Sequence, residues 1–213
     1  MESSWPVYLL GLLAQGLFSA RMLVQWISSE KAGKVVSPTI FWVLSLIASY
    51  IFFIYGWLRE DFSLMLGQII GYCAYIWNIG AKGVWKRLSQ PLLILLKAVL
   101  IITPLICIGL LLRNPAAVAD SLFKNENLPL WMVIFGSAGQ IIFSFRFLYQ
   151  AIYSSRRGES ILPKGFWLIS LAGSLIIFSY GLMRLDPVVI LAQAFGIFTY
   201  TRNLIIWKKS HAS

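Results

Sequence analysis

The sequence carries little charge for its length. Only 12% of its 213 residues are Asp, Glu, Lys or Arg, whereas a soluble domain carries about 25%. Hydrophobic residues make up 59%, and the mean hydropathy is +0.77. These values exclude an ordinary soluble globular domain and predict a protein that resides in a lipid bilayer.

Acidic residues, histidine and cysteine are also scarce. The chain has eight Asp and Glu residues, a single histidine, His211, and two cysteines, Cys73 and Cys107. One terminal histidine argues against a histidine-based catalytic or metal site. The cysteines lack metal-ligand spacing and are expected to be unpaired thiols buried in the membrane. No acid–base or nucleophile set lies in the apolar runs, so we expect no enzyme activity, metal or cofactor.

Long apolar runs dominate what is present. About 20 apolar residues suffice to cross a bilayer as a helix. The sequence therefore predicts an all-α membrane protein with seven transmembrane helices, at residues 5–27, 38–58, 62–80, 91–112, 130–152, 164–183 and 187–207. Charged or turn-forming stretches separate these runs. The first run follows Glu2 and lacks a small-residue cleavage motif, so we expect it to be a retained span rather than a signal peptide.

The distribution of Lys and Arg predicts the orientation. The loops after the first, third and fifth spans and the C-terminus hold ten basic residues, and the opposite side holds four. By the positive-inside rule the C-terminus is cytoplasmic and the N-terminus periplasmic. The net charge of +10 is scattered in short clusters between apolar runs, which does not indicate nucleic-acid binding.

The two ends of the sequence repeat each other. A shift of 125 residues aligns residues 11–79 with 136–204 without a gap, with 27 identical positions out of 69. Each repeat holds three spans, and the span at 91–112 has no counterpart. An odd number of spans would invert the second repeat, and the extra span restores its orientation. We predict a parallel 3+1+3 arrangement, with three-helix repeats at 1–80 and 130–213 and a linker with the unpaired helix at 81–129.

The matched polar and aromatic residues fall on single helical faces and are our candidates for substrate binding. Polar side chains are unfavourable in contact with lipid, so we expect these faces to point toward the protein interior. The candidates are Arg21, Arg146, Gln25, Gln150, Gln15, Gln140, Gln68, Gln193, Asn78, Asn203, Trp42, Trp167, Tyr75 and Tyr200.

Arg21 and its match Arg146 pose the sharpest question. Each lies about 9 Å inside its span, at 1.5 Å per residue, and a charge inside a bilayer costs several kcal/mol. One interpretation is that both side chains snorkel to the cytoplasmic headgroups. The other is that they point inward and bind an anion. Their recurrence favours the second, as does the absence of a matched carboxylate in the spans. The planar guanidinium fork suits phosphate.

Other matched residues have structural alternatives. Gln15 and Gln140 are either cavity lining or hydrogen-bonding contacts between helices. For Trp42 and Trp167, an interfacial aromatic belt is the default expectation. Arg59 with Asp61, and Arg184 with Asp186, are expected to form ion pairs that fix two outer turns.

The motif order resembles a known family. GxxxQxxFSxRxLxQ, PxxFWxxSLxxS, YG, RxD and QxxGxxxY occur twice in order, over about two thirds of the chain. This pattern resembles the lipid-A-disaccharide synthase N-terminal-like domain, which is similar to the PQ-loop and SWEET transporters. The resemblance implies a SWEET-like membrane module that serves envelope glycolipids in the bacterial inner membrane. The longest stretch outside the predicted spans, 113–129, is too short for a glycosyltransferase fold.

Three functions follow as hypotheses. The first is a flippase for a polyprenyl-phosphate-linked sugar or related glycolipid precursor, with the phosphate held by the paired arginines. The second is a SWEET-type transporter of a small sugar, although a neutral sugar does not need two arginines. The third is a non-transporting membrane partner of a lipid A or envelope glycosyltransferase. The expected partners are therefore a membrane lipid and, under the third hypothesis, such an enzyme.

Overall fold

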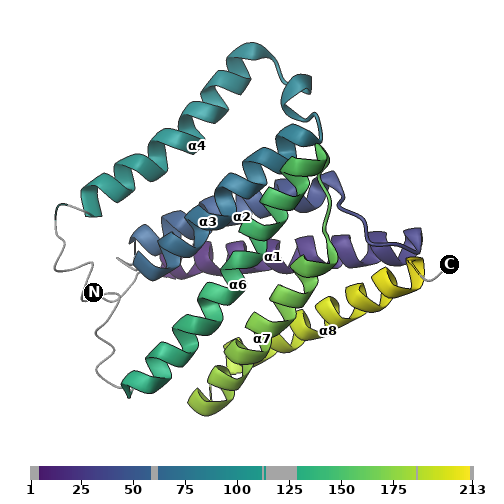
Figure 1. Ribbon diagram of the computed structural model, residues 1–213. Helices are drawn as coiled ribbons and strands as arrows, with labels where there is room; N and C mark the ends of the chain where they lie inside the picture. Colours follow the sequence, from purple (N-terminus) through teal and green to yellow (C-terminus); the bar gives the residue numbers. More distant parts are fainter. Residues whose placement is uncertain (1–4, 59–61, 112, 114–128, 186, 212–213) are drawn as a thin grey trace. The chain divides into compact units, whose positions relative to one another are not determined.

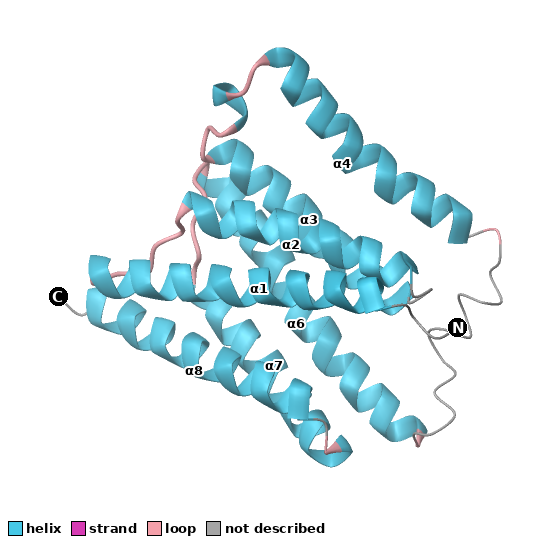
Figure 2. Ribbon diagram, turned by 180° about the vertical axis from the view of Figure 1, so that it is seen from behind, coloured by secondary structure: helices cyan, strands magenta, loops and turns pink. Residues whose placement is uncertain are grey.

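The computed structural model describes residues 5–58, 62–111, 113, 129–185 and 187–211. All regular structure in these ranges is helical, as Figure 2 shows, with pink loops between cyan helices. The elements are α1 (Trp5–Ala32), α2 (Thr39–Leu58), α3 (Phe62–Ala81), the short 3-10 helix η1 (Trp85–Arg87), α4 (Gln90–Leu111), α6 (Leu130–Arg157), α7 (Lys164–Arg184) and α8 (Pro187–Ser210). Each of the seven apolar runs coincides with one α-helix.

Four of the helices are long and apolar enough to cross a membrane, as judged by length and composition within the described ranges. They are Trp5–Ala32, Thr39–Leu58, Lys164–Arg184 and Val189–Ser210. The all-α class and the membrane-compatible helices agree with the sequence analysis. The count of seven spans and the SWEET-like arrangement stay predictions, as do the boundaries at 80 and 130.

Helices α1 and α6 extend about one turn beyond the apolar runs from which they were predicted. The predicted spans stop at residues 27 and 152, whereas the helices end at Ala32 and Arg157. The extra residues are polar but favour helix. Both helices stop where a glycine adopts a left-handed conformation, at Gly33 (φ 63°) and Gly158 (φ 68°). This is a common helix C-terminus because glycine has no Cβ to clash, and it recurs at equivalent positions of the two repeats.

The chain divides into two compact units, with the division falling within α1. Unit 1 comprises Met1–Arg21 and Trp42–Glu126, and unit 2 comprises Met22–Phe41 and Asn127–Ser213. In unit 2, α7 packs against both α6 and α8, and the three helices are drawn in green to yellow in Figure 1.

Small residues bring neighbouring helices close together. A Cβ at Gly173 of α7 would lie 2.8 Å from the backbone of Phe143 in α6, so only glycine fits. In unit 1, Gly11 of α1 faces the ring of Tyr55, and in unit 2 its match Gly136 faces Tyr180. A Cβ at either glycine would lie 2.9 Å from that ring. Close approach at small residues is typical of helix packing in membranes, where dispersion contacts replace the hydrophobic effect.

Candidate functional site

Each repeat contains a set of five equivalent residues, one of which is a buried arginine. We call these sets the arginine clusters. The first comprises Phe18, Arg21, Trp42, Ser45 and Tyr75, and the second comprises Phe143, Arg146, Trp167, Ser170 and Tyr200. The first lies in unit 1 and the second in unit 2. Each set draws its residues from all three helices of its repeat.

In the first cluster, α1 presents the arginine to α2 and α3. Nη1 of Arg21 donates to the Ser45 hydroxyl (2.8 Å) and to the Tyr75 hydroxyl (3.1 Å). The guanidinium carbon lies 4.6 Å from the centroid of the Phe18 ring. The rings of Trp42 and Tyr75 lie 6.2 Å apart between centroids. The charge therefore lies against hydroxyls and π-faces, which interact favourably with a cation.

In the second cluster, the arginine stacks more closely on aromatic rings. The guanidinium carbon of Arg146 lies 3.2 Å from the Phe143 centroid and 4.5 Å from that of Phe147. The rings of Trp167 and Tyr200 are 6.1 Å apart, close to the spacing of the matching pair in the first cluster. The buried Nε1 of Trp167 has no hydrogen-bond partner within the described part of the chain.

Both arginines are buried in protein, with 6% of each side chain exposed. Snorkelling to the headgroups would leave them exposed, so the inward orientation is the one that the structure has. The tryptophans are a correction to the sequence analysis. Trp42 and Trp167 are both 0% exposed, and so they do not form an interfacial belt. They pack inside the helix bundle of each repeat, beside the tyrosines.

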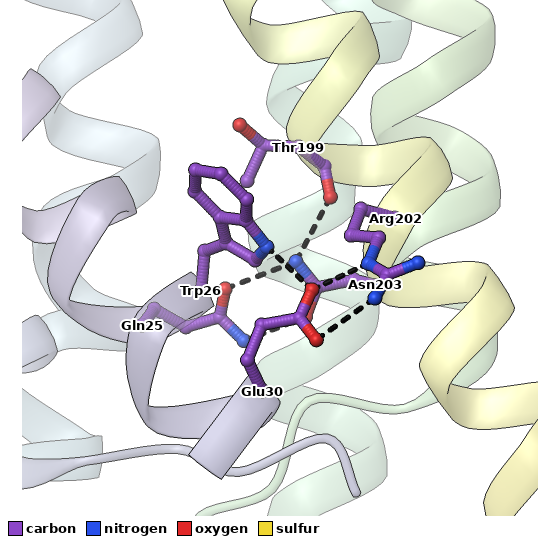
Figure 3. Close-up of polar contacts among 6 residues, drawn as sticks. All are labelled: Gln25, Trp26, Glu30, Thr199, Arg202 and Asn203. Carbon is purple, nitrogen blue, oxygen red and sulfur yellow. Dashed lines mark hydrogen bonds and ion pairs between the residues drawn. The ribbon is translucent and has the colours of Figure 1, made fainter. Parts of the chain in front are cut away.

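Gln25 and Asn203 meet as a reciprocal amide pair, although they lie 178 residues apart. Nε2 of Gln25 donates to Oδ1 of Asn203 (2.8 Å), and Nδ2 of Asn203 donates to Oε1 of Gln25 (3.1 Å). Both side chains are 0% exposed. Figure 3 shows the pair between α1 and α8, within unit 2. Because the residues belong to different repeats, the pair joins one repeat to the other.

The matched glutamines also fix the loops that follow α1 and α6. Nε2 of Gln25 donates to the Ser29 hydroxyl (2.9 Å) and to the Val36 carbonyl (3.3 Å), and the Val36 N–H donates back to Ser29 (3.1 Å). In the second repeat, Gln150, Ser154 and Ile161 repeat this pattern, with distances of 2.9, 2.9 and 3.2 Å. These bonds satisfy backbone groups of the turn. Pro38 in the first repeat, or Pro163 in the second, follows this turn and precedes the next helix.

Four of the remaining candidates, all glutamines, are less enclosed. Gln15 and Gln140 are exposed on their helices, and Gln68 and Gln193 are half-buried. Oε1 of Gln193 accepts a bond from Ser174 (2.8 Å). Asn78 donates to the Ala74 carbonyl (2.7 Å), as Asn203 does to the Thr199 carbonyl (2.9 Å). Among the candidates, the structure thus brings together Arg21 with Tyr75, Trp42 with Tyr75, Trp167 with Tyr200, and Gln25 with Asn203.

An ion pair that the sequence analysis missed lies beside the amide pair. Arg202 of α8 contacts Glu30 of α1 through two bonds, from Nε to Oε1 and from Nη2 to Oε2, the latter 3.0 Å long. The indole N–H of Trp26 also donates to Glu30 (2.8 Å). Neither member is duplicated, since Ser155 and Trp77 occupy the matching positions. The repeat therefore gave no signal of this pair. Ser29 and Ser154 are identical at matching positions, but the sequence analysis did not single them out.

Two expectations fall wholly or partly outside the described residues. The turn at Arg59 and Asp61, and Asp186 in the matching turn, lie there. Arg184 is exposed and donates to the Tyr180 hydroxyl (3.2 Å). Cys73 is a free thiol, as expected, and its side chain lies on the protein surface. The side chain of Cys107 lies outside the described part of the chain.

Comparison with known proteins identifies the family. The family model of the Lipid A Biosynthesis N-terminal domain matches residues 10–80 and again residues 135–205. The chain belongs to this lipid A biosynthesis N-terminal domain family. The two matches are offset by 125 residues, which is the shift found within the sequence, and so the domain occurs twice in tandem.

Curated relatives extend the match beyond the two domains. The lipid-A-disaccharide synthase of Chlamydia caviae is 30% identical over 96% of this chain, and that of Chlamydia muridarum is 31% identical over 94%. The chain spans about a third (34%) of the length of each of these relatives. The match covers only that part of an enzyme, and it relates the chain to proteins of lipid A biosynthesis. No solved structure matches.

Proposed function

We propose that this chain is a bacterial inner-membrane transporter, a flippase for a polyprenyl-phosphate-linked sugar or a related envelope glycolipid precursor. The observation that carries the proposal is the buried arginine at the same position of both repeats, with its guanidinium against the ring of Phe18 in the first repeat and of the matching Phe143 in the second. In this proposal the chain has seven spans, a periplasmic N-terminus and a cytoplasmic C-terminus, and it is not an enzyme.

Physical chemistry supports an anionic cargo. Removing a guanidinium from water costs several kcal/mol, so a purely structural contact is better made by apolar residues. Here the cost is incurred twice, at equivalent positions. A guanidinium donates two parallel hydrogen bonds to a phosphate, which gives both strength and orientation. The membership in a lipid A biosynthesis family favours a phosphorylated glycolipid as the source of that phosphate.

The other candidates take narrower roles in this proposal. Trp42, Trp167, Tyr75 and Tyr200 shape the surroundings of the arginines and contact the sugar or the first isoprene units. Gln68, Gln193 and the exposed Gln15 and Gln140 rearrange around a polar head group. Gln25, Gln150, Asn78 and Asn203 fix loops and helices, and they reach cargo only if those bonds open.

A second function is favoured by one observation. The relatives that cover most of this chain are about three times as long and are named lipid-A-disaccharide synthases. A separate module of this family could therefore hold or present a lipid to an envelope glycosyltransferase without moving it. This alternative predicts lipid binding without transport.

Reconstitution into liposomes tests the proposal. Purified protein in phosphatidylcholine vesicles is expected to move a fluorescent short-chain polyprenyl-phosphate sugar between leaflets faster than protein-free vesicles do, as measured by dithionite quenching of the outer leaflet. The same vesicles should not speed the entry of radiolabelled glucose. Glucose entry without lipid movement would favour a SWEET-type transporter. Lipid binding with no movement of either would favour the presenting role.

A further inference from the structure

Unit 2 contains a cavity of about 470 Å³, and no residue of the arginine clusters is among those that line it. Three cations from three different segments line it: Lys34 from the loop after α1, Arg157 from the end of α6 and Lys164 from the start of α7. No Asp or Glu is among the described residues that line it. Its size lies within the range of small-molecule sites. Three like charges around one hollow repel one another unless an anion lies between them.

Aromatic rings hold two of these cations at the cavity wall. The ammonium of Lys164 lies 4.9 Å from the centroid of Trp207, and the guanidinium carbon of Arg157 lies 5.5 Å from that of Tyr153. Both rings line the cavity. Cation–π contacts of this kind restrict long basic side chains that would otherwise sample many rotamers. The cations are therefore partly ordered before a ligand arrives.

The start of α7 adds hydrogen-bond donors to the same cavity. Pro163, Lys164 and Gly165 line it, and no side chain caps this helix N-terminus. Helix N-termini carry free N–H groups and a partial positive charge, and they bind phosphates. A Cβ at Gly165 would lie 2.5 Å from the ring of Tyr149, so a larger residue there would displace this ring. The absence of that Cβ also leaves the backbone accessible.

The basic and aromatic residues that line the cavity are not repeated in the first half of the chain. The first-repeat positions that match Arg157, Lys164 and Trp207 are Ala32, Thr39 and Lys82, and those that match Tyr149 and Tyr153 are Val24 and Ser28. The shared three-helix fold therefore does not require these basic and aromatic residues. They occur together only where the second repeat and the loop after α1 form this hollow.

From this convergence we propose that the cavity is a binding site for a phosphate-bearing head group. Arg157, Lys34 and Lys164 neutralise the phosphate, the first turn of α7 donates to its oxygens, and the tyrosines flank the group to which it is esterified. By the distribution of basic residues this site faces the cytoplasm. It is separate from the arginine clusters and does not depend on whether the chain transports lipid. A lipid head group and a soluble sugar phosphate share this chemistry.

Binding measured by isothermal titration calorimetry in neutral dodecylmaltoside tests the proposal. The probes are farnesyl phosphate, glucose 1-phosphate, farnesol and laurate. Farnesyl phosphate or glucose 1-phosphate should bind, and binding should weaken as salt is raised. A preference for farnesyl phosphate identifies a lipid head group, and the reverse identifies a soluble ligand. Equal binding of farnesol or laurate would overturn the phosphate assignment, as would no binding by either phosphate.

A pair of charge-matched variants locates the site. Lys34→Gln/Arg157→Gln/Lys164→Gln removes the three lining cations and should weaken phosphate binding about tenfold or more. Lys31→Gln/Arg156→Gln/Lys208→Gln removes three cations from neighbouring positions that do not line the cavity, and it should bind like the wild type. Equal losses in the two variants would mean that overall charge alone attracts the ligand, and the cavity would not be the site. Loss of transport in the arginine-cluster variants leaves this result unaffected.

Discussion

Replacement of Arg21 or Arg146 by alanine is expected to slow glycolipid movement in liposomes by about 10- to 100-fold each. A hydrogen bond to a charged group contributes about 1.5–3 kcal/mol, and each 1.4 kcal/mol corresponds to a factor of about ten. Lysine at either position should restore part of the rate, because it keeps the charge but not the planar fork. Dithionite first quenches the labelled lipid of the outer leaflet. The measurement is the initial rate at which the protected inner-leaflet fluorescence is then lost, at matched protein density.

The control for this prediction is another cation within an apolar helix. Lys97 of α4 is exposed in the structure, so Lys97→Ala should leave the rate unchanged. Each variant must elute as a single species and keep its helical circular dichroism, because Arg21 also bonds to Ser45 and Tyr75. Wild-type rates in folded Arg21→Ala and Arg146→Ala proteins would refute a phosphate-binding role for the arginine clusters.

Much of the fold could be read from hydropathy and the internal repeat. Apolar runs located the seven α-helices of the described residues, because a helix suited to lipid must be apolar along its length. They did not locate the ends of α1 and α6, since hydropathy marks where lipid contact stops rather than where hydrogen bonding stops. The glycines at 33 and 158 carried that information, because a left-handed residue ends the helix.

The candidate site was predictable to a lesser extent. Recurrence correctly singled out Arg21 and Arg146 as inward-facing, because a repeated buried charge is too costly to be incidental. Periodicity placed Gln25 and Asn203 on polar faces, but it could not tell which groups satisfy one another. In the amino-acid sequence, two amides that bond to each other look the same as two amides that bind a sugar. The Glu30–Arg202 contact was invisible for another reason, since it breaks the symmetry between the repeats.

The buried amide pair provides the largest expected effect on stability. Asn203→Leu removes both bonds to Gln25. The side-chain oxygen of Gln25, a residue that is 0% exposed, then lacks the donor from Asn203. An unsatisfied buried polar group costs about 1–3 kcal/mol. A hydrogen bond between membrane helices contributes about 0.6 kcal/mol to stability on average, and about 1.7 kcal/mol at most. We therefore expect a loss of about 2 kcal/mol in the free energy of unfolding, measured by SDS titration of protein in dodecylmaltoside micelles.

The double variant Gln25→Leu/Asn203→Leu separates pairing from packing. If the two amides stabilise the protein chiefly through each other, the double variant should lose less than the sum of the single losses, with a coupling of about 1 kcal/mol. Gln25→Leu alone should cost more than Asn203→Leu, because it also frees the Val36 carbonyl and Ser29 from their amide donor. Glu30→Gln, which alters the partly exposed ion pair between the same two helices, is the matched control and should cost less than either. Strict additivity of the two leucine substitutions would show that this pair does not join the two repeats energetically.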